Sequence, residues 1–283
     1  MTYFCIFNIL ELMDKSSPIG VFDSGIGGLS VLKQFIRLLP SEQYIYLGDT
    51  ARVPYGNKSN ETVNRYAKDC TEFLLKKDVK LIIVACNTVS AVALETIKSI
   101  AGNIAVIGMI APAVNGALRT TVNGKIGVIG TRATINSNTY EKSIKTVNQS
   151  DFEVFSQECP LFVPFVEEGL INHPATKLIA EDYLKKLKDY GIDTLILGCT
   201  HYPLLNKLIM EILPNVNLID TGEHAAINAI RLLAENNMLG EEKNNMLSNH
   251  KIDFYVTDVP TLFFEIAKKF LGFSVESPTL IKM

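Results

Sequence analysis

The stretch LIIVACNT at residues 81–88 has a counterpart of the same pattern, TLILGCTH, at residues 194–201. Each is an apolar run, which predicts a buried strand, and each ends in a cysteine followed by polar residues. Both copies are followed by residues in a helical pattern, and Pro203 suits the first turn of the second helix. We therefore expect Cys86 and Cys199 where a parallel strand gives way to a helix, at the sheet edge where α/β proteins bind ligands.

The beginnings of the two halves also match. IGVFDS at residues 19–24 and IGVIGT at residues 126–131 are both short strands that open into a polar turn. The separation from strand start to cysteine is 67 residues in the first half (86 − 19) and 73 in the second (199 − 126). We predict an α/β fold of two pseudo-symmetric, open parallel-sheet domains. The active site lies in the cleft between them, with one cysteine on each wall.

The order of predicted elements gives the domain boundaries. The first domain is discontinuous and comprises residues 14–111 plus 224–283, because a late strand and helix return to it; the second comprises residues 112–223. Residues 1–13 form an N-terminal extension, which lacks the basic start and cleavage site of a signal peptide. A length of 283 residues with 47% hydrophobic residues suits two well-buried cores.

Composition excludes several classes of function. A net charge of −3 argues against nucleic acid as a main partner, and no apolar run approaches the roughly 18–20 residues of a membrane span. Five cysteines without a C-x-x-C pair, and four scattered histidines, give no metal or dithiol spacing. We expect no metal site and, without a secretion signal, reduced thiols and a cytoplasmic location.

Two further loops carry candidate residues. DSGIGGLS at residues 23–30 matches neither dinucleotide nor Walker patterns, and a tight strand-to-helix turn explains its glycines. It explains Asp23 less well, since a carboxylate at the end of a buried strand is costly without a partner. In GDTARVPYG at residues 48–56, Tyr55 and Gly56 suit a ligand wall, while Asp49 and Arg52 suit a pair that holds the loop.

Other candidates have ordinary structural interpretations too. Cys70 falls at helical spacing within residues 61–77, which predicts a core position. Residues 159–169 form a mostly apolar loop that ends in Glu167 and Glu168. Either acid suits a partner for His201 or an ordinary helix start, and His201 itself suits a helix cap.

Two thiols facing one ligand suit a two-base proton exchange. One thiolate removes a proton from carbon on one face and the other thiol delivers a proton on the opposite face, so each acts as base in one direction and acid in the other. Asp23 is expected near Cys86, and His201 near Cys199. Two alternatives remain open: buried cysteines that merely fill space, and a non-catalytic, two-lobed amino-acid-binding or regulatory protein.

Four motifs in order resemble the glutamate racemases of the aspartate/glutamate racemase superfamily, with similarity from about residue 17 to about residue 271: PIGVFDSGIGGLS (18–30), GDTARVPYG (48–56), VACNT (84–88) and LGCTHYP (197–203). The resemblance implies cofactor-independent interconversion of L- and D-glutamate, supplying D-glutamate for peptidoglycan, by an enzyme that is usually a homodimer. Aspartate racemase is the nearest alternative, and the 48–56 loop favours glutamate.

The resemblance also implies roles for individual residues. Cys86 and Cys199 are the two acid/base residues. Asp23, His201 and one acid of the Glu167–Glu168 pair are auxiliary, with Glu167 the better match. The positions implied to contact substrate are Asp23, Ser24, Tyr55, Gly56, Asn87, Thr88, Thr200 and His201.

Overall fold

The computed structural model describes residues 14–147, 152–241, 252–259, 261, 263–275 and 277–283. The predicted extension 1–13 therefore lies outside the described residues. Within the described ranges, no helix combines the length and the apolar character needed to cross a bilayer.

The described chain forms two sheets, and every strand pair in them is parallel. The six-stranded sheet has the order β10 (Thr279–Leu280), β9 (Ile252–Val256), β2 (Tyr44–Gly48), β1 (Ile19–Asp23), β3 (Leu81–Val84) and β4 (Ala105–Gly108). The four-stranded sheet has the order β6 (Glu153–Glu158), β5 (Lys125–Gly130), β7 (Thr194–Gly198) and β8 (Asn217–Asp220).

The two sheets share one topology, as the repeated sequence pattern predicts. The order β2-β1-β3-β4 in the first sheet corresponds to β6-β5-β7-β8 in the second. Ile19 pairs with Leu81, and in the second sheet Ile126 pairs with Thr194, so the equivalent strands also share their register. Cys86 and Cys199 consequently occupy equivalent places, and the predicted fold class is confirmed.

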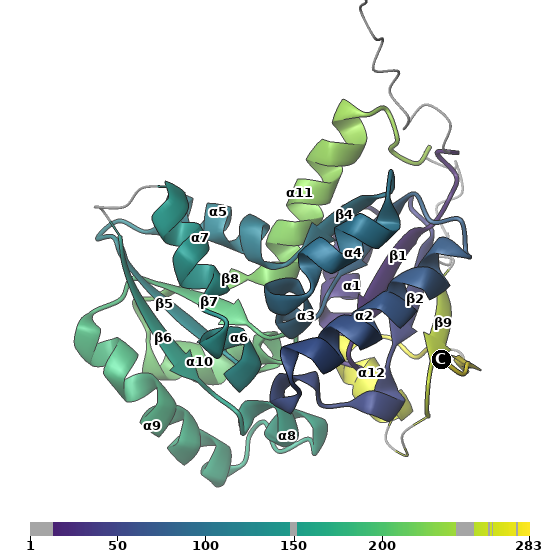
Figure 1. Ribbon diagram of the computed structural model, residues 1–283. Helices are drawn as coiled ribbons and strands as arrows, with labels where there is room; N and C mark the ends of the chain where they lie inside the picture. Colours follow the sequence, from purple (N-terminus) through teal and green to yellow (C-terminus); the bar gives the residue numbers. More distant parts are fainter. Residues whose placement is uncertain (1–13, 148–151, 242–251, 260, 262, 276) are drawn as a thin grey trace, which may run out of the picture.

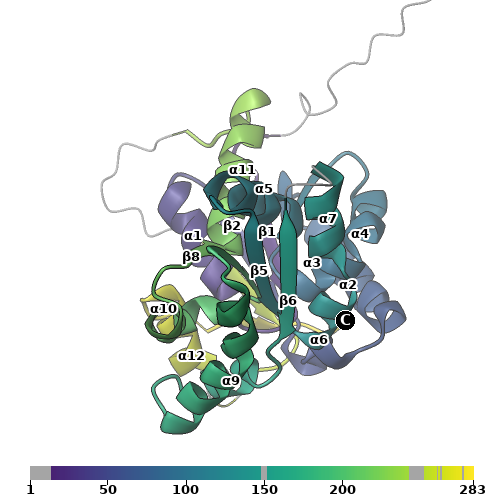
Figure 2. The same ribbon diagram turned by 90° about the vertical axis from the view of Figure 1, so that its left-hand side faces the viewer.

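Helices cover both faces of each sheet (Figures 1 and 2). On the first sheet, α2 (Asn60–Leu75) and α4 (Leu94–Ala101) pack on one face, while α1 (Leu29–Leu38) and α12 (Phe263–Leu271) pack on the other. On the second, α5 (Ile110–Thr120) and α7 (Thr139–Val147) lie opposite α9 (Pro174–Tyr190) and α10 (Asn206–Ile212). Alternate strand residues face the two layers, which leaves the strands buried on both sides.

Helix α11 (Thr221–Glu235) joins the two halves, and Figure 1 shows it running between their helices. It contacts α1 through the ion pair between Arg37 Nη2 and Glu223 Oε1, at 2.7 Å. It contacts α5 at Gly116, where a Cβ atom would lie 2.4 Å from Cε1 of His224. A side chain at residue 116 would force the imidazole of His224 to move, so glycine favours this close approach of the two helices.

The structure contains two short helices that the sequence analysis does not predict. The first is α6 (Arg132–Asn136), which is separated from α7 by Asn138 at φ +55°. The predicted apolar loop at 159–169 contains α8 (Phe162–Glu167). Pro164 is compatible with α8 because it falls in the first turn, where its missing N–H has no helical partner. Cys70 is fully buried, as predicted.

Candidate active site

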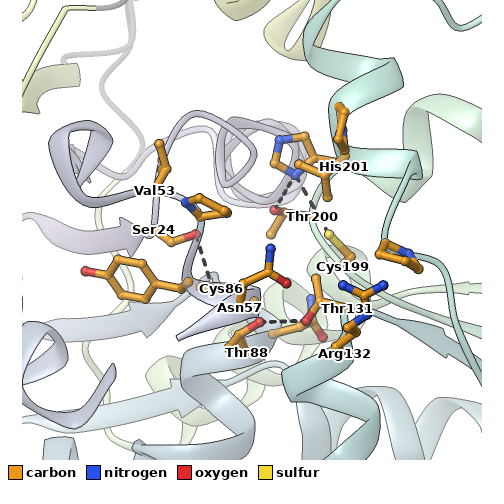
Figure 3. A pocket seen from close by; sticks show the side chains of 18 of the residues that line it. Ser24, Val53, Asn57, Cys86, Thr88, Thr131, Arg132, Cys199, Thr200 and His201 are labelled. Atoms are coloured by element: carbon orange, nitrogen blue, oxygen red, sulfur yellow. Dashed lines mark hydrogen bonds between the residues drawn. The ribbon is translucent and has the colours of Figure 1, made fainter. Parts of the chain in front are cut away.

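A cavity lies at the carboxyl ends of β1, β3, β5 and β7, between the two sheets. Figure 3 shows Cys86 on one side of it and Cys199 on the other. Most of the predicted site residues line it: Ser24, Tyr55, Gly56, Cys86, Asn87, Thr88, Glu167, Cys199, Thr200 and His201. The topology thus brings together residues that are up to 177 positions apart in the chain (201 − 24).

Cys86 occupies the wall formed by the first half. It is the N-cap residue of α3 (Asn87–Val92), and only 5% of it is exposed. Its Sγ lies 3.5 Å from Oγ of Ser24. Burial, together with the neighbouring carboxylate of Asp23, raises the pKa of Cys86 to about 12. This cysteine therefore carries its proton at neutral pH.

Asp23 is fully buried beneath the cavity wall and is not among the residues that line the cavity. The reason is the glycine-rich turn folded over it: a Cβ atom at Gly28 would lie 2.4 Å from Cβ of Asp23. Its Oδ2 accepts a hydrogen bond from the amide of Gly25 at 3.0 Å, whereas its buried Oδ1 has no hydrogen-bond partner among the residues that the structure describes. Burial raises the pKa of Asp23, so this carboxyl can hold a proton beside Cys86.

Cys199 occupies the opposite wall, next to an ordered acid–base chain. Its Sγ is 3.8 Å from Nδ1 of His201, and Nε2 of His201 is 3.0 Å from Oε1 of Glu167. Burial alone would lower the pKa of His201, but Cys199 and Glu167 together raise it to about 10. His201 is therefore a cation at neutral pH, and its charge lies next to the sulfur of Cys199.

The sequence left open whether Glu167 or Glu168 is the partner of His201, and the two side chains lie in different places. Glu167 is the last residue of α8, lines the cavity and contacts His201. Glu168 is exposed and does not line the cavity. Only the first of the pair is thus placed to orient the histidine.

The glycine-rich turn also holds the two walls together. A Cβ atom at Gly27 would lie 2.3 Å from Cε1 of His201, so only glycine permits this approach. The hydroxyl of Ser30 donates to the carbonyl oxygen of Thr200 at 2.6 Å. The turn that follows β1 therefore fixes the segment that carries Cys199.

The polar groups between the walls are mostly hydrogen-bonded to each other. Oγ1 of Thr88 lies 3.0 Å from Oγ1 of Thr131, which belongs to the other half (Figure 3). Asn87 accepts from the hydroxyl of Tyr140 at 2.6 Å and donates to Oγ1 of Thr221 at 3.3 Å. These side chains are preorganised donors and acceptors for a polar ligand.

Tyr55 is a buried residue of the cavity wall and is 1% exposed. Its hydroxyl donates to the buried carboxylate of Asp49 rather than pointing into the cavity. Tyr55 and Gly56 therefore form the wall with ring and backbone. At Gly56 a Cβ atom would lie 2.8 Å from Cβ of Thr131, so the loop closes directly against the second half.

Sequence reasoning missed Thr131 and Arg132, which line the cavity from α6 and its N-cap. The repeat could have indicated Thr131, because its place after β5 corresponds to that of Ser24 after β1. Among the described residues that line this cavity, Arg132 is the only lysine or arginine. Its Nε is 3.6 Å from Oε2 of Glu158 and its side chain is 58% exposed, so it is only loosely paired.

Comparisons with known proteins identify the family to which the chain belongs. The model of the family described as Asp/Glu/Hydantoin racemase matches residues 19–229. The chain therefore belongs to the Asp/Glu/hydantoin racemase family.

Within that family, the chain is similar to named glutamate racemases. It is 48% identical to that of Chlorobaculum tepidum (96% of this chain, 98% of the relative) and 44% identical to that of Neisseria meningitidis (97% and 100%). The glutamate racemase of Francisella tularensis, solved in complex with D-glutamate, has a TM-score of 0.87 at 42% identity (95% and 98%). An isoform from Bacillus anthracis has a TM-score of 0.89 at 39% identity (95% and 99%).

More distant solved structures share the fold alone. The aspartate racemase of Picrophilus torridus is 16% identical, with a TM-score of 0.55 over 80% of this chain and 100% of that one.

Proposed function

We propose that this protein is a glutamate racemase, which interconverts L- and D-glutamate by proton exchange between two thiols and needs no cofactor. One observation carries the proposal: Cys86 and Cys199 occupy equivalent positions on facing walls of one cavity, each beside its own ionisable partner. A proton removed from the α-carbon by one thiolate and replaced from the other side inverts that carbon.

One direction of the reaction starts with the proton on Cys86. The raised pKa of Cys86 keeps its proton in place, so this thiol is the acid. On the other wall, Cys199 is the base, and its sulfur lies 3.8 Å from Nδ1 of the cationic His201. After inversion the states are exchanged, with the proton on Cys199, and the reverse reaction starts from there.

The polar lining supports an amino dicarboxylate as substrate. Hydroxyl groups of Ser24, Thr88, Thr131 and Thr200 surround the space between the thiols, and Arg132 adds a positive charge beside it. Charge-assisted hydrogen bonds to carboxylates are the stronger class of such bonds. Glutamate is favoured over aspartate because the similar proteins that cover nearly all of this chain are named glutamate racemases.

We further propose the cellular setting and assembly that the family resemblance implies. The protein works as a homodimer in the cytoplasm and supplies D-glutamate for peptidoglycan. Its chain divides into a first domain of residues 14–111 plus 224–283 and a second of residues 112–223, with residues 1–13 as an extension. The two separate sheets support this division.

The proposal is tested by circular dichroism of purified protein with L-glutamate, and with L-aspartate in a parallel cell, without added cofactor. Decay of the glutamate signal to zero is the expected result. Decay with aspartate alone would keep the chemistry and change the substrate. A steady signal in both cells, from folded protein with reduced thiols, would favour a binding protein and reject the racemase.

A further inference from the structure

The loop between β2 and α2 forms one wall of the cavity but is held from behind, outside the cavity. Five consecutive residues of this loop, 53–57, line the cavity. Asp49, at the start of the loop, is fully buried and is not a lining residue. A buried carboxylate is costly unless its oxygens are hydrogen-bonded, so its partners indicate what it holds.

The partners of Asp49 come from the loop itself and from the C-terminal part of the chain. Its Oδ2 accepts from Nε of Arg52 at 2.6 Å and from the hydroxyl of Tyr55. Its Oδ1 accepts from Oγ1 of Thr257, just after β9, at 2.8 Å. Its amide donates to the carbonyl of Asp23 at 3.0 Å. Both carboxylate oxygens are thus satisfied by donors from separate segments, which fixes one arrangement of the loop.

A second layer fixes these partners. Nη1 of Arg52 donates to Oδ2 of Asp69 on α2 at 2.7 Å, and the guanidinium lies 4.2 Å from the centroid of the Tyr66 ring. The rings of Tyr55 and Tyr66 are 5.3 Å apart, centroid to centroid. Burial, with nearby Cys70 and Asp49, raises the pKa of Tyr55, so its hydroxyl remains a donor.

The C-terminal strand closes the loop from the other side. The amide of Ala51 donates to Oγ1 of Thr257 at 2.9 Å, and Oγ1 of Thr50 donates to the carbonyl of Asp258 at 2.5 Å. The loop is therefore held between α2 and the end of β9, and the carboxylate of Asp49 is the group that contacts both the strand end and Tyr55.

We propose that Asp49 is a positioning residue for substrate binding, which sets the cavity width by fixing Tyr55 and Gly56 against Thr131 on the opposite wall. This inference rests on the proposed racemase function. Gly56 already touches Thr131 closely, so a small movement of the loop changes the space between the walls. A displacement of about 1 Å from a remote change is enough to cost up to about 10²-fold in rate.

The test compares Asp49→Asn with Asp69→Asn in the full-length protein. Asparagine keeps the shape, but one of its two atoms is a donor, so it cannot accept from all three partners. We expect Asp49→Asn to raise the KM for glutamate and the Kd for D-glutamate about tenfold, with a smaller change in kcat. Asp69 binds the same arginine but not Tyr55, and Asp69→Asn is expected to leave KM within about twofold.

Two further variants keep the test decisive if Asp49→Asn does not fold. Tyr55→Phe removes only the hydroxyl donor, and Thr257→Val removes the donor to the other oxygen; each is expected to raise KM. The double variant Asp49→Asn/Tyr55→Phe should be no worse than Asp49→Asn alone, because both remove one interaction. A reduced melting temperature with KM unchanged, or equal KM values in the Asp49 and Asp69 variants, would overturn the inference.

Failure of this inference is distinguishable from failure of the proposed function. Wild-type protein that does not racemise glutamate rejects the proposed function, and this inference with it. Wild-type protein that racemises while Asp49→Asn, Tyr55→Phe and Thr257→Val all keep its KM rejects only the role of Asp49.

Discussion

Replacing Glu167 by glutamine removes the carboxylate that orients and charges His201. Oε1 of Glu167 lies 3.0 Å from Nε2 of His201, and with Cys199 it raises the pKa of the histidine from 6.5 to about 10. Glutamine keeps the size of the side chain and loses its charge. The imidazolium of His201 therefore loses one of its two stabilising partners while the other, Cys199, remains.

The size of the effect follows from the contact and its exposure. A hydrogen bond to a charged group contributes about 1.5–3 kcal/mol, and about 1.36 kcal/mol corresponds to one pKa unit. The side chain of Glu167 is 39% exposed, so solvent screening places this contact at the lower end. The pKa of His201 should therefore fall by about one pH unit in Glu167→Gln.

The assay is the pH dependence of kcat/KM for racemisation, followed by circular dichroism from about pH 7 to about pH 10.5. Because a raised pKa is being lowered, the alkaline limb should move to lower pH, and the rate near neutral pH should change little. Glu168→Gln is the matched control, since Glu168 is exposed and lies outside the cavity. An alkaline limb that does not move in Glu167→Gln, or that moves equally in Glu168→Gln, would refute the reasoning.

Three other predictions follow from the structure. Cys86→Ala and Cys199→Ala should each lower kcat by at least about 10²–10⁴-fold in the dichroism assay while keeping a native unfolding transition; activity near wild type in either would contradict the two-thiol mechanism. Arg132→Gln should raise KM for glutamate several-fold and weaken the dependence of kcat/KM on ionic strength, measured by salt titration, whereas an unchanged salt dependence would remove its electrostatic role. Nζ of Lys80 lies 2.6 Å from Oε2 of Glu42, and the two side chains are 0% and 3% exposed. The substitution Lys80→Met should therefore lower the free energy of unfolding, measured by denaturant titration, by about 3–5 kcal/mol, because it leaves the Glu42 carboxylate buried without this partner. A loss below about 1 kcal/mol would contradict a stabilising role for this ion pair.

The repeated pattern predicted the fold well because its signals are local. Apolar runs before Cys86 and Cys199 identify buried parallel strands without reference to the rest of the chain. Equivalent spacing in the two halves then gives equivalent topology, which the matching strand orders confirm. Short helices were harder to predict from the sequence. Helix α6 has only five residues, and the prolines at 160 and 164 made the α8 segment resemble a loop.

The details of the site depend on contacts that no local pattern encodes. Asp23 lies beneath the wall because Gly28 allows the turn to fold onto it, and the turn residues alone do not reveal that direction. The hydroxyl of Tyr55 is bound by Asp49, six residues earlier, although the same sequence is compatible with a hydroxyl in the cavity. Arg132 enters the cavity only because α6 from the second half closes on the loop that contains Gly56.

The central claim is that two different groups remove and deliver the α-proton, and solvent deuterium tests it most directly. Wild-type protein is incubated with L-glutamate in deuterium oxide, and the two enantiomers are separated early and analysed by mass spectrometry. If Cys199 keeps the proton that it removes while Cys86 delivers a deuteron from solvent, D-glutamate carries deuterium from the start and the remaining L-glutamate carries none. D-glutamate that retains the original hydrogen, or L-glutamate labelled as fast as D-glutamate appears, would contradict the account.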